Sequence, residues 1–267
     1  MAKIAYIFDV DGVITNPSLK KVEHKEILLK LAKLLENNIV ALNTGRSLSW
    51  LIDRVINPLL EISDNYKNFE NFYAVGEKGG TWLEIDKDGK IIKFRDESIS
   101  IPDKLKIKVE ELVEAEFSNT TFYDDSKETM VSTEMLDGQN PEKEYRSDQK
   151  ILVTKLQEVL KEEGLSENFK IDPTTIATDI ENKIVGKDFA VRRIIDWVKT
   201  NNINPERIIC FGDSKSDIPM AQELYEMGFP LEFVFVGTEQ LKNDLPFKLF
   251  YTQEKYDKGT LEYLNQE

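Results

Sequence analysis

The residues best suited to chemistry follow an apolar run near the start of the chain. Residues 4–8 (IAYIF) are typical of a short strand buried on both faces, and Asp9, Asp11 and Gly12 come directly after it. Along an extended chain the two carboxylates would share a face and repel each other. That repulsion is tolerable if a divalent cation lies between them and a phosphate, or if one carboxyl stays protonated. A polar turn is the alternative, because Asp and Gly are common in turns.

A second polar group follows the apolar run at residues 39–42. Thr44, Gly45 and Arg46 stand there, just before apolar residues at helical spacing from 48 to 56. A hydroxyl, a glycine N–H and a guanidinium at the start of a helix are groups that bind phosphate oxygens. The same three residues are also typical of a helix cap followed by an exposed arginine.

A lysine stands near the start of a later helical pattern. Apolar residues recur at helical spacing between 183 and 198, and Lys187 lies close to the first turn. The helix dipole disfavours a cation at that end, so the position of Lys187 is explained if it faces an anion. A solvated surface lysine is the alternative interpretation.

Two more acids follow another buried strand. Residues 207–211 (RIICF) are mostly apolar, and Gly212, Asp213 and Asp217 come after them. The carboxyl ends of parallel strands meet at one edge of a sheet, where open α/β folds bind ligands. The sequence therefore predicts that Asp213 and Asp217 point toward the same edge as Asp9.

The elements that must position these residues alternate between strand and helix. This order at the start of the chain indicates parallel strands joined by right-handed crossovers. We therefore predict an α/β fold with a Rossmann-like parallel sheet and helices on both faces. Residues 76–80 (GEKGG) are read as a turn. The further elements expected are strands at 72–75, 233–236 and 248–251, a hairpin over 82–94 that turns at 88–89, and a final helix at 260–264.

The middle of the chain follows a different order. Helical spacing at 105–113 and 152–160 alternates with two pairs of strands, at 120–136 and 169–180, and residues 139–148 read as a polar loop. Strands joined by short turns pair antiparallel, so we predict a small α+β unit inserted into the parallel-sheet protein. The predicted division is core residues 1–95, an inserted domain at 96–182 and core residues 183–267.

Composition limits the partners that the chain can have. Its 267 residues suffice for a core and an inserted domain, and its net charge of −14 argues against nucleic acid or an anionic membrane surface. The single cysteine, Cys210, is expected in the core and excludes a disulfide framework, and the single histidine, His24, excludes a His/Cys zinc cluster. Neither a membrane-spanning run nor a signal peptide is evident, which predicts a cytoplasmic protein. No protein partner is implied.

These groups together resemble the motifs of the haloacid dehalogenase superfamily of phosphohydrolases. The family's motifs are DxD followed by Gly, a Ser or Thr that ends a strand, a lysine, and GDxxxD. In that order they match Asp9, Asp11 and Gly12; Thr44; Lys187; and Gly212, Asp213 and Asp217. The match extends over the whole chain. One departure is Val13, where the family often has Thr.

The resemblance implies a phosphoric monoester hydrolase that uses Mg²⁺. By similarity, Asp9 is the nucleophile that forms an aspartyl-phosphate, and Asp11 protonates the leaving oxygen and then activates water. The implied metal ligands, an all-oxygen set suited to Mg²⁺, are a carboxylate of Asp9, the backbone carbonyl of Asp11 and the carboxylate of Asp213, with Asp217 nearby. The groups expected to bind the phosphoryl group are Thr44, the N–H of Gly45, Arg46 and Lys187.

The inserted unit resembles the superfamily's larger kind of cap, found in trehalose, sucrose and mannosyl-phosphoglycerate phosphatases and in phosphomannomutases. The implied substrate is a small phosphorylated metabolite. A sugar or polyol phosphate is favoured because strands near 175–179 offer hydroxyls and a carboxylate, although Thr-rich strands are also simply good strands. A phosphomutase with the same Asp9 chemistry stays open as an alternative. A response-regulator receiver would be shorter and lack the cap, and a binding protein without catalysis would not fill every catalytic position.

Overall fold

The computed structural model describes residues 3–136, 142–241 and 244–266. The chain forms two compact units, one from Met1–Phe94 and Gly186–Glu267 and the other from Arg95–Val185. The predicted insertion, 96–182, falls inside the second unit. Within the described ranges, no helix combines the length and the apolar character needed to cross a membrane.

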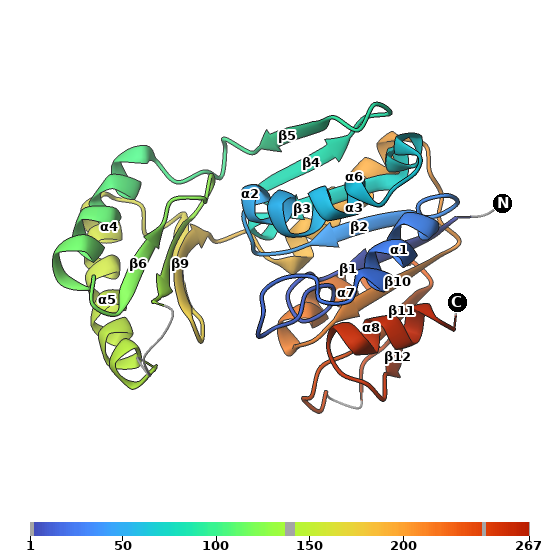
Figure 1. Ribbon diagram of the computed structural model, residues 1–267. Helices are drawn as coiled ribbons and strands as arrows, with labels where there is room; N and C mark the ends of the chain where they lie inside the picture. Colours follow the sequence, from blue (N-terminus) through green and yellow to red (C-terminus); the bar gives the residue numbers. More distant parts are fainter. Residues whose placement is uncertain (1–2, 137–141, 242–243, 267) are drawn as a thin grey trace. The chain divides into compact units, whose positions relative to one another are not determined.

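An eight-stranded sheet forms the centre of the first unit (Figure 1). Its strands are β1 (Ile4–Phe8), β2 (Ile39–Asn43), β3 (Phe72–Gly76), β4 (Thr81–Ile85), β5 (Ile91–Arg95), β10 (Arg207–Gly212), β11 (Leu231–Phe235) and β12 (Lys248–Tyr251). They lie in the order β12-β11-β10-β1-β2-β3-β4-β5. All neighbours from β12 to β3 pair in parallel, and β4 is antiparallel to β3. The predicted Rossmann-like parallel sheet is confirmed.

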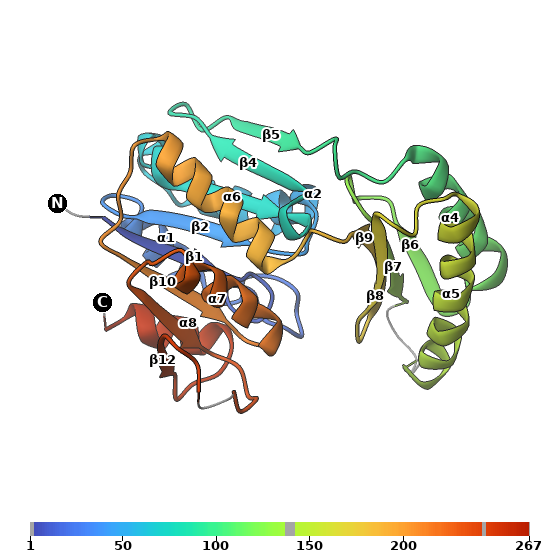
Figure 2. The same cartoon turned by 180° about the vertical axis from the view of Figure 1, so that it is seen from behind.

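Helices cover both faces of this sheet, as predicted. They are α1 (Lys25–Leu34), α2 (Leu48–Leu51), α3 (Asn57–Glu61), α6 (Lys187–Thr200), α7 (Ile218–Glu226) and α8 (Asp257–Leu264). A π-helical turn, Ile52–Ile56, joins α2 to α3. Helices α1, α3 and α8 lie on the face seen in Figure 1, and α6 and α7 lie on the face seen in Figure 2.

Successive side chains of the central strands pack on opposite faces of the sheet. In β1, Tyr6 and Phe8 pack in an apolar cluster with residues of α1 and α8, whereas Ala5 and Ile7 pack with residues of α6 and α7. All four side chains are buried. Because helices cover both sides, the strand has no solvent face, and this explains its continuous apolar run. Cys210 in β10 is also buried in the core, as expected.

Strands β4 and β5 form the predicted hairpin. In its turn, Oδ1 of Asp86 accepts hydrogen bonds from the backbone N–H groups of Asp88 and Lys90, each at 2.9 Å. Gly89 has a φ of +81°, a left-handed conformation that glycine adopts without steric cost. The Asp-Gly pair in the sequence therefore marked this turn correctly.

The second unit has its own antiparallel sheet. Its elements in chain order are α4 (Asp103–Glu116), β6 (Thr121–Asp124), β7 (Val131–Met135), α5 (Glu142–Glu162), β8 (Phe169–Pro173) and β9 (Ala177–Asn182). The strands lie in the order β6-β7-β9-β8, and each neighbouring pair is antiparallel. The predicted order of helix, two strands, helix and two strands is confirmed. A separate apolar cluster, with residues of α4 and α5 against the sheet, forms its core.

The polar loop predicted at 139–148 is wrong for its larger part. Helix α5 already begins at Glu142, while residues 139–141 lie outside the described residues. Tyr145 and Gln149 are both buried, and Nε2 of Gln149 donates to the carbonyl oxygens of Thr174 and Ala177, each at 3.0 Å. Gln149 is polar but buried and hydrogen-bonded, so it belongs to the inward face of the helix. A search for apolar residues at helical spacing overlooks such a residue, and the start of the helix was therefore missed.

Candidate active site

Three of the residues predicted to form the active site follow the carboxyl ends of three neighbouring strands. Asp9 follows β1, Thr44 follows β2 and Asp213 follows β10, and β1 lies between the other two in the sheet. The N–H of Asp9 donates to the carbonyl of Phe211 at 3.0 Å, which continues the parallel pairing one residue beyond the strand. The sheet order therefore brings loops that are far apart in the sequence to one edge.

Lys187 lies among three oxygen groups at this edge. Its Nζ donates to Oδ1 of Asp9 in a close contact, donates to the backbone carbonyl of Asn43 at 2.7 Å, and lies 3.1 Å from Oδ1 of Asp217. Its side chain is only 12% exposed, so it is not the solvated surface lysine of the alternative interpretation. The lysine at the start of α6 therefore faces anions, as the helix-dipole argument predicted.

Asp217 has a structural role as well as an electrostatic one. Its Oδ2 accepts hydrogen bonds from the N–H groups of Asp213 and Ser214, both at 3.1 Å, and from the hydroxyl of Ser214 at 3.2 Å. A Cβ at Gly212 would lie 2.5 Å from Cβ of Asp217, so glycine is required for this close approach. Asp217 thus closes the loop that carries Asp213.

The carboxylates at this edge outnumber the cations that they contact. Burial, and then the carboxylate of Asp217, raises the pKa of Asp9 well above its usual range, and the same two causes raise the pKa of Asp213 to about 7. Burial alone would lower the pKa of Lys187, but Asp9 and Asp217 outweigh it and raise this pKa above its usual value. Lys187 therefore keeps its charge, but one lysine does not balance the carboxylates, and Asp9 and Asp213 are shifted toward their protonated forms.

This arrangement fits a divalent cation. Asp9, Asp213 and Asp217 each offer a carboxylate oxygen, and these three atoms lie within 4.8 Å of one another. Oδ1 of Asp217 is fully buried, and its contact is the ion pair with Nζ of Lys187 at 3.1 Å. Carboxylate oxygens are the ligands that Mg²⁺ prefers, and a cation here would offset the excess charge.

Asp11 and Arg46 form a separate pair at the same edge. Nε of Arg46 lies 3.2 Å from Oδ1 and 3.0 Å from Oδ2 of Asp11, and its Nη2 lies 3.0 Å from Oδ1. The guanidinium also lies over the Trp50 ring, 4.9 Å from its centroid. The Asp11 side chain is 38% exposed, whereas that of Arg46 is 16% exposed. The exposed arginine of the alternative interpretation is therefore not found, and Arg46 holds the carboxylate of Asp11 in place.

The loop of Thr44, Gly45 and Arg46 is fixed by the turn that follows β3. The N–H of Lys78 donates to the carbonyl of Thr44, and that of Glu77 to the carbonyl of Arg46, both at 3.0 Å. The Thr44 hydroxyl accepts from the N–H of Arg46 at 3.0 Å. A Cβ at Gly45 would meet only ordinary contacts with Lys78. The packing of the loop therefore does not by itself require glycine there.

Sequence reasoning missed the part that this turn plays. Glu77 and Lys78 have φ values of +49° and +54°, a conformation that costs a non-glycine residue about 1–2 kcal/mol. The carbonyl of Lys78 accepts from the N–H of Gly186 at 3.1 Å, so the turn also holds the start of α6 and hence Lys187. In the sequence, the glycines around these residues indicated a turn. They did not indicate that the turn binds the loop of Thr44 and Arg46 and the start of α6.

Asn43 is a second residue that sequence reasoning missed. It is fully buried, and its Nδ2 donates to the carbonyl of Lys187 at 2.9 Å while its own carbonyl accepts from Lys187 Nζ. This reciprocal pair joins the end of β2 to the start of α6. An asparagine at the end of an apolar strand offers no clue to such a partner 144 residues away.

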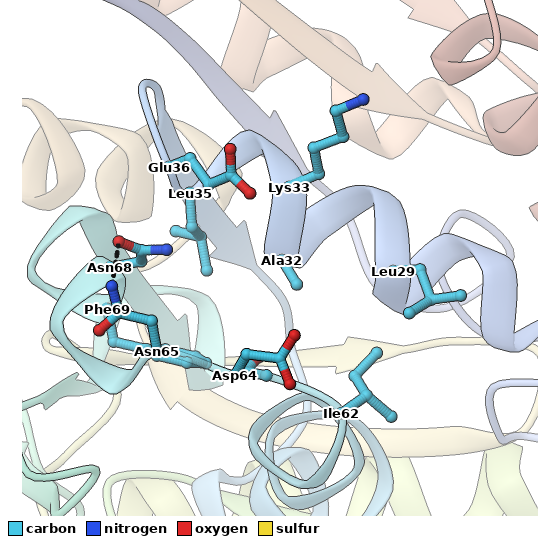
Figure 3. A pocket seen from close by; sticks show the side chains of 11 residues that line it. Leu29, Ala32, Lys33, Leu35, Glu36, Ile62, Asp64, Asn65, Asn68 and Phe69 are labelled. Carbon is cyan, nitrogen blue, oxygen red and sulfur yellow. Dashed lines mark hydrogen bonds between the residues drawn. The ribbon is translucent and has the colours of Figure 1, made fainter.

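Two hollows of this unit lie away from the candidate active site. A cavity of about 430 Å³ lies between α1 and the segment 62–69, and Figure 3 shows Lys33, Asp64 and Asn65 among its lining residues. A second cavity, of about 550 Å³, includes Phe72, the first residue of β3. Both adjoin the amino ends of strands, and neither is lined by a predicted site residue.

Comparisons with known proteins agree with the architecture. The sequence model of the haloacid dehalogenase-like hydrolases matches residues 59–228, which is more than half of the chain. No curated protein matches the chain in sequence. Among solved structures, the trehalose-6-phosphate phosphatase of Aspergillus fumigatus is 19% identical with a TM-score of 0.58, and the match covers 100% of this chain and 94% of that one.

Two further structures show how widely the fold is shared. The C-terminal domain of the trehalose-6-phosphate phosphatase of C. albicans is 16% identical with a TM-score of 0.66, over 99% of this chain and 91% of that one. The IMP-nucleotidase of Plasmodium falciparum is 15% identical with a TM-score of 0.54, over 82% of this chain and 56% of that one. At these identities the likeness establishes the fold alone.

We expect Gly12→Ala to destabilise the first unit more than Gly228→Ala. Both glycines have positive φ values, +74° and +84°, so alanine is strained at either by about 1–2 kcal/mol. Only at Gly12 would the new Cβ collide with the carboxylate of Asp213, whereas nothing lies within 4 Å at Gly228. Urea unfolding followed by tryptophan fluorescence measures this, because Trp50, Trp82 and Trp197 all belong to the first unit. Equal losses of unfolding free energy would show that the contact with Asp213 is unimportant.

Proposed function

The chain belongs to the haloacid dehalogenase-like hydrolase family, and from this premise we propose that it is a Mg²⁺-dependent phosphatase that cleaves a phosphate monoester through an aspartyl-phosphate on Asp9. The observation that carries the proposal is the contact of Lys187 with Asp9 inside a group of three carboxylates, of which Asp9 and Asp217 are buried and Asp213 is half-buried. Such a group suits a reaction in which a carboxylate attacks a phosphate, because cations must first overcome the repulsion between two anions.

Asp9 is the nucleophile in the first step. A carboxylate oxygen of Asp9 forms a bond to phosphorus as the bond between phosphorus and the ester oxygen breaks. Asp9 is nine-tenths buried, and Lys187 fixes its orientation through the contact with Oδ1. In the second step, water attacks phosphorus, the bond to Asp9 breaks, and inorganic phosphate leaves.

The residues proposed to hold Mg²⁺ are Asp9, Asp213 and the backbone carbonyl of Asp11, with Asp217 beside them. When bound, the ion would supply positive charge that offsets the charge of the phosphoryl oxygens. Lys187 supplies a second, fixed positive charge. Its three contacts with Asp9, Asp217 and the Asn43 carbonyl hold its side chain in one position. Thr44 and the N–H of Gly45 are proposed to bind the phosphoryl oxygens.

Asp11 moves the protons. It donates one to the leaving oxygen in the first step and takes one from the attacking water in the second. Its two-point contact with Arg46 orients the carboxylate for the second role. For the first role, Arg46 has to turn away from Asp11. The incoming phosphoryl group is an anion, so the guanidinium of Arg46 can pair with it instead. Arg46 therefore alternates between Asp11 and the substrate phosphate in this proposal.

The substrate is proposed to be a sugar or polyol phosphate, chosen by the second unit. The residues named above contact only the phosphoryl group, which all phosphate monoesters share, so they cannot distinguish one ester from another. The trehalose-6-phosphate phosphatases with the same fold support this substrate class. No feature of the described residues favours a phosphomutase, in which the phosphoryl group would return to a sugar.

We expect Asp9→Asn to abolish phosphate release, because an amide cannot form the aspartyl-phosphate. The measurement is inorganic phosphate released from a panel of phosphorylated sugars and polyols, with Mg²⁺ and with a chelator, and wild-type activity should also be lost in the chelator. Asp53→Asn, at an exposed aspartate on the same unit, is the matched control and should remain active. Near wild-type turnover by Asp9→Asn, in a preparation free of host phosphatases, would exclude Asp9 as nucleophile.

We expect Asp11→Asn to slow poor leaving groups more than good ones. Loss of a general acid should reduce kcat/KM for an alkyl phosphate by a factor on the order of 10² relative to an activated aryl phosphate. Lys187→Ala is the comparison variant, and it should slow both substrates alike because Lys187 acts on the phosphoryl group. If Asp11→Asn affects both substrates equally, Asp11 is not the proton donor.

We expect exchange of the second unit to change the preferred substrate. In a chimera, residues 95–185 are replaced by the corresponding unit of a phosphatase with a different substrate. The chimera should cleave a different metabolite while it still requires Mg²⁺ and Asp9. A folded, active chimera with unchanged preference across the metabolite panel would contradict the assignment of selectivity to this unit.

A further inference from the structure

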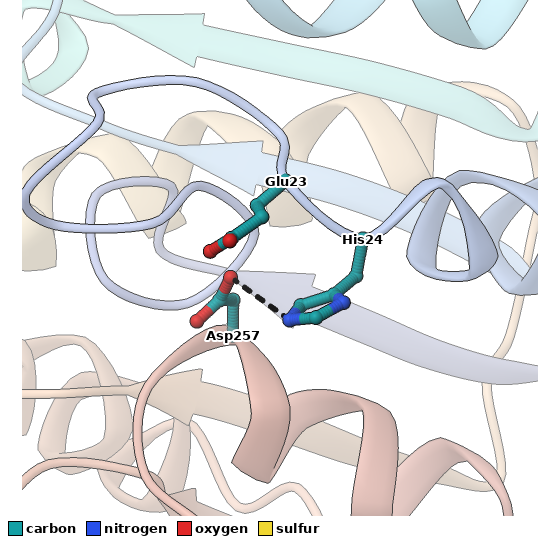
Figure 4. Close-up of side chains that lie close together, drawn as sticks. All are labelled: Glu23, His24 and Asp257. Atoms are coloured by element: carbon teal, nitrogen blue, oxygen red, sulfur yellow. Dashed lines mark ion pairs between the residues drawn. The ribbon is translucent and has the colours of Figure 1, made fainter.

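A second group of potential metal ligands lies on the first unit, outside the candidate active site. It comprises Glu23 and His24, which directly precede α1, and Asp257, the first residue of α8. Each offers one ligand atom, and the three atoms lie within 4.8 Å of one another. Figure 4 shows the three side chains turned toward a common point between the two segments. Helices α1 and α8 also contact each other.

Two of these ligand atoms are buried without a hydrogen-bond partner among the described residues. They are Nε2 of His24 and Oδ2 of Asp257, and the Asp257 side chain is only 3% exposed. A buried polar atom with no partner loses its hydrogen bonds to water without replacement, so such atoms are rare in native proteins. Here two of them face each other, and a single ligand between them would satisfy both.

The distance between the two atoms distinguishes a metal from a direct bond. Nε2 of His24 and Oδ2 of Asp257 are 4.0 Å apart, whereas a charge-assisted hydrogen bond would be about 2.7–2.9 Å long. Zinc bonds to nitrogen and oxygen of about 2.0–2.2 Å place two ligands of a tetrahedral ion roughly 3.4 Å apart. A slight approach of the two side chains therefore suffices for an ion to bridge them.

The third ligand is already oriented. Nδ2 of Asn16 donates to Oε2 of Glu23 at 2.7 Å, and this hydrogen bond restrains the carboxylate beside the other two groups. A second contact that holds a ligating side chain is typical of metal sites. Glu23 itself is exposed, so an ion could enter from the solvent on its side.

We propose that Glu23, His24 and Asp257 bind a divalent transition-metal ion, with Zn²⁺ as the best fit to one imidazole and two carboxylates. The imidazole sets this group apart from the all-carboxylate cluster at Asp9, which suits Mg²⁺. The sequence excluded a zinc cluster built from several His and Cys residues, but not one in which carboxylates supply the other ligands. The bound ion joins the segment before α1 to α8 and stabilises the first unit.

The single histidine of the chain makes the test specific. The full-length protein, prepared without a histidine tag and labelled with ¹⁵N-histidine, has only the His24 imidazole to observe. Addition of Zn²⁺ should shift the Nε2 resonance until one equivalent is bound, while Mg²⁺ should leave it unchanged. Unchanged His24 resonances at millimolar Zn²⁺, or resonances that respond to pH alone, would mean that His24 and Asp257 form an ion pair only and would overturn the proposal.

Thermal unfolding gives an independent readout. Zn²⁺ should raise the Tm of the wild type, because a ligand that binds only the folded state stabilises it. His24→Gln and Asp257→Asn should weaken Zn²⁺ binding at least tenfold, and Glu26→Gln, at an exposed acid in the first turn of α1, should leave it intact. If Asp257→Asn fails to fold, Glu23→Gln replaces it. An equal rise in Tm for wild type and His24→Gln would place the zinc elsewhere and refute the site.

Discussion

The gathering of three carboxylates, two of them buried, around one lysine is the constraint on which the rest of the first unit depends. Lys187 contacts Asp9 and Asp217, and Asp213 stands within reach of both acids. Buried ion pairs seldom stabilise a protein, because removing the charges from water costs about as much as their attraction returns. Here the acids also outnumber the lysine, and the raised pKa of Asp9 and of Asp213 reflects first their burial and then that imbalance. An arrangement that does little for stability is best explained by what it binds.

The fold holds this arrangement through backbone contacts instead of further charges. The strained residues Glu77 and Lys78 bind the loop of Thr44 and Arg46 on one side, and Lys78 binds Gly186 before α6 on the other. Such strain persists only where the surrounding structure determines the conformation. The parallel sheet is the rigid base for these loops, since its strands are packed by helices on both faces. The backbone segments that carry the candidate catalytic side chains are thus bound to one another.

The two proposed cation sites of the first unit differ in their donor atoms and in their place in the chain. The site at Asp9 has carboxylates that follow strands, and the site at His24 joins the segment before α1 to the first residue of α8. The segment from Asp9 to His24 connects them, and it also carries Asp11. A cation at the second site would fix the far end of that segment.

The sequence by itself predicted most of the elements and named the candidate catalytic residues. The apolar runs before Asp9 and Asp213 predict buried strands, and their alternation with helical patterns predicts a parallel sheet, because both signals depend on residues close together in the chain. Only the tertiary structure decided which groups meet. Arg46 pairs with Asp11, Asn43 with Lys187, and Gln149 with the carbonyls after β8, and no local pattern encodes such partners. Polar contacts depend on the positions of single atoms, which only the packing of distant segments fixes, whereas an apolar face is repeated along its own element.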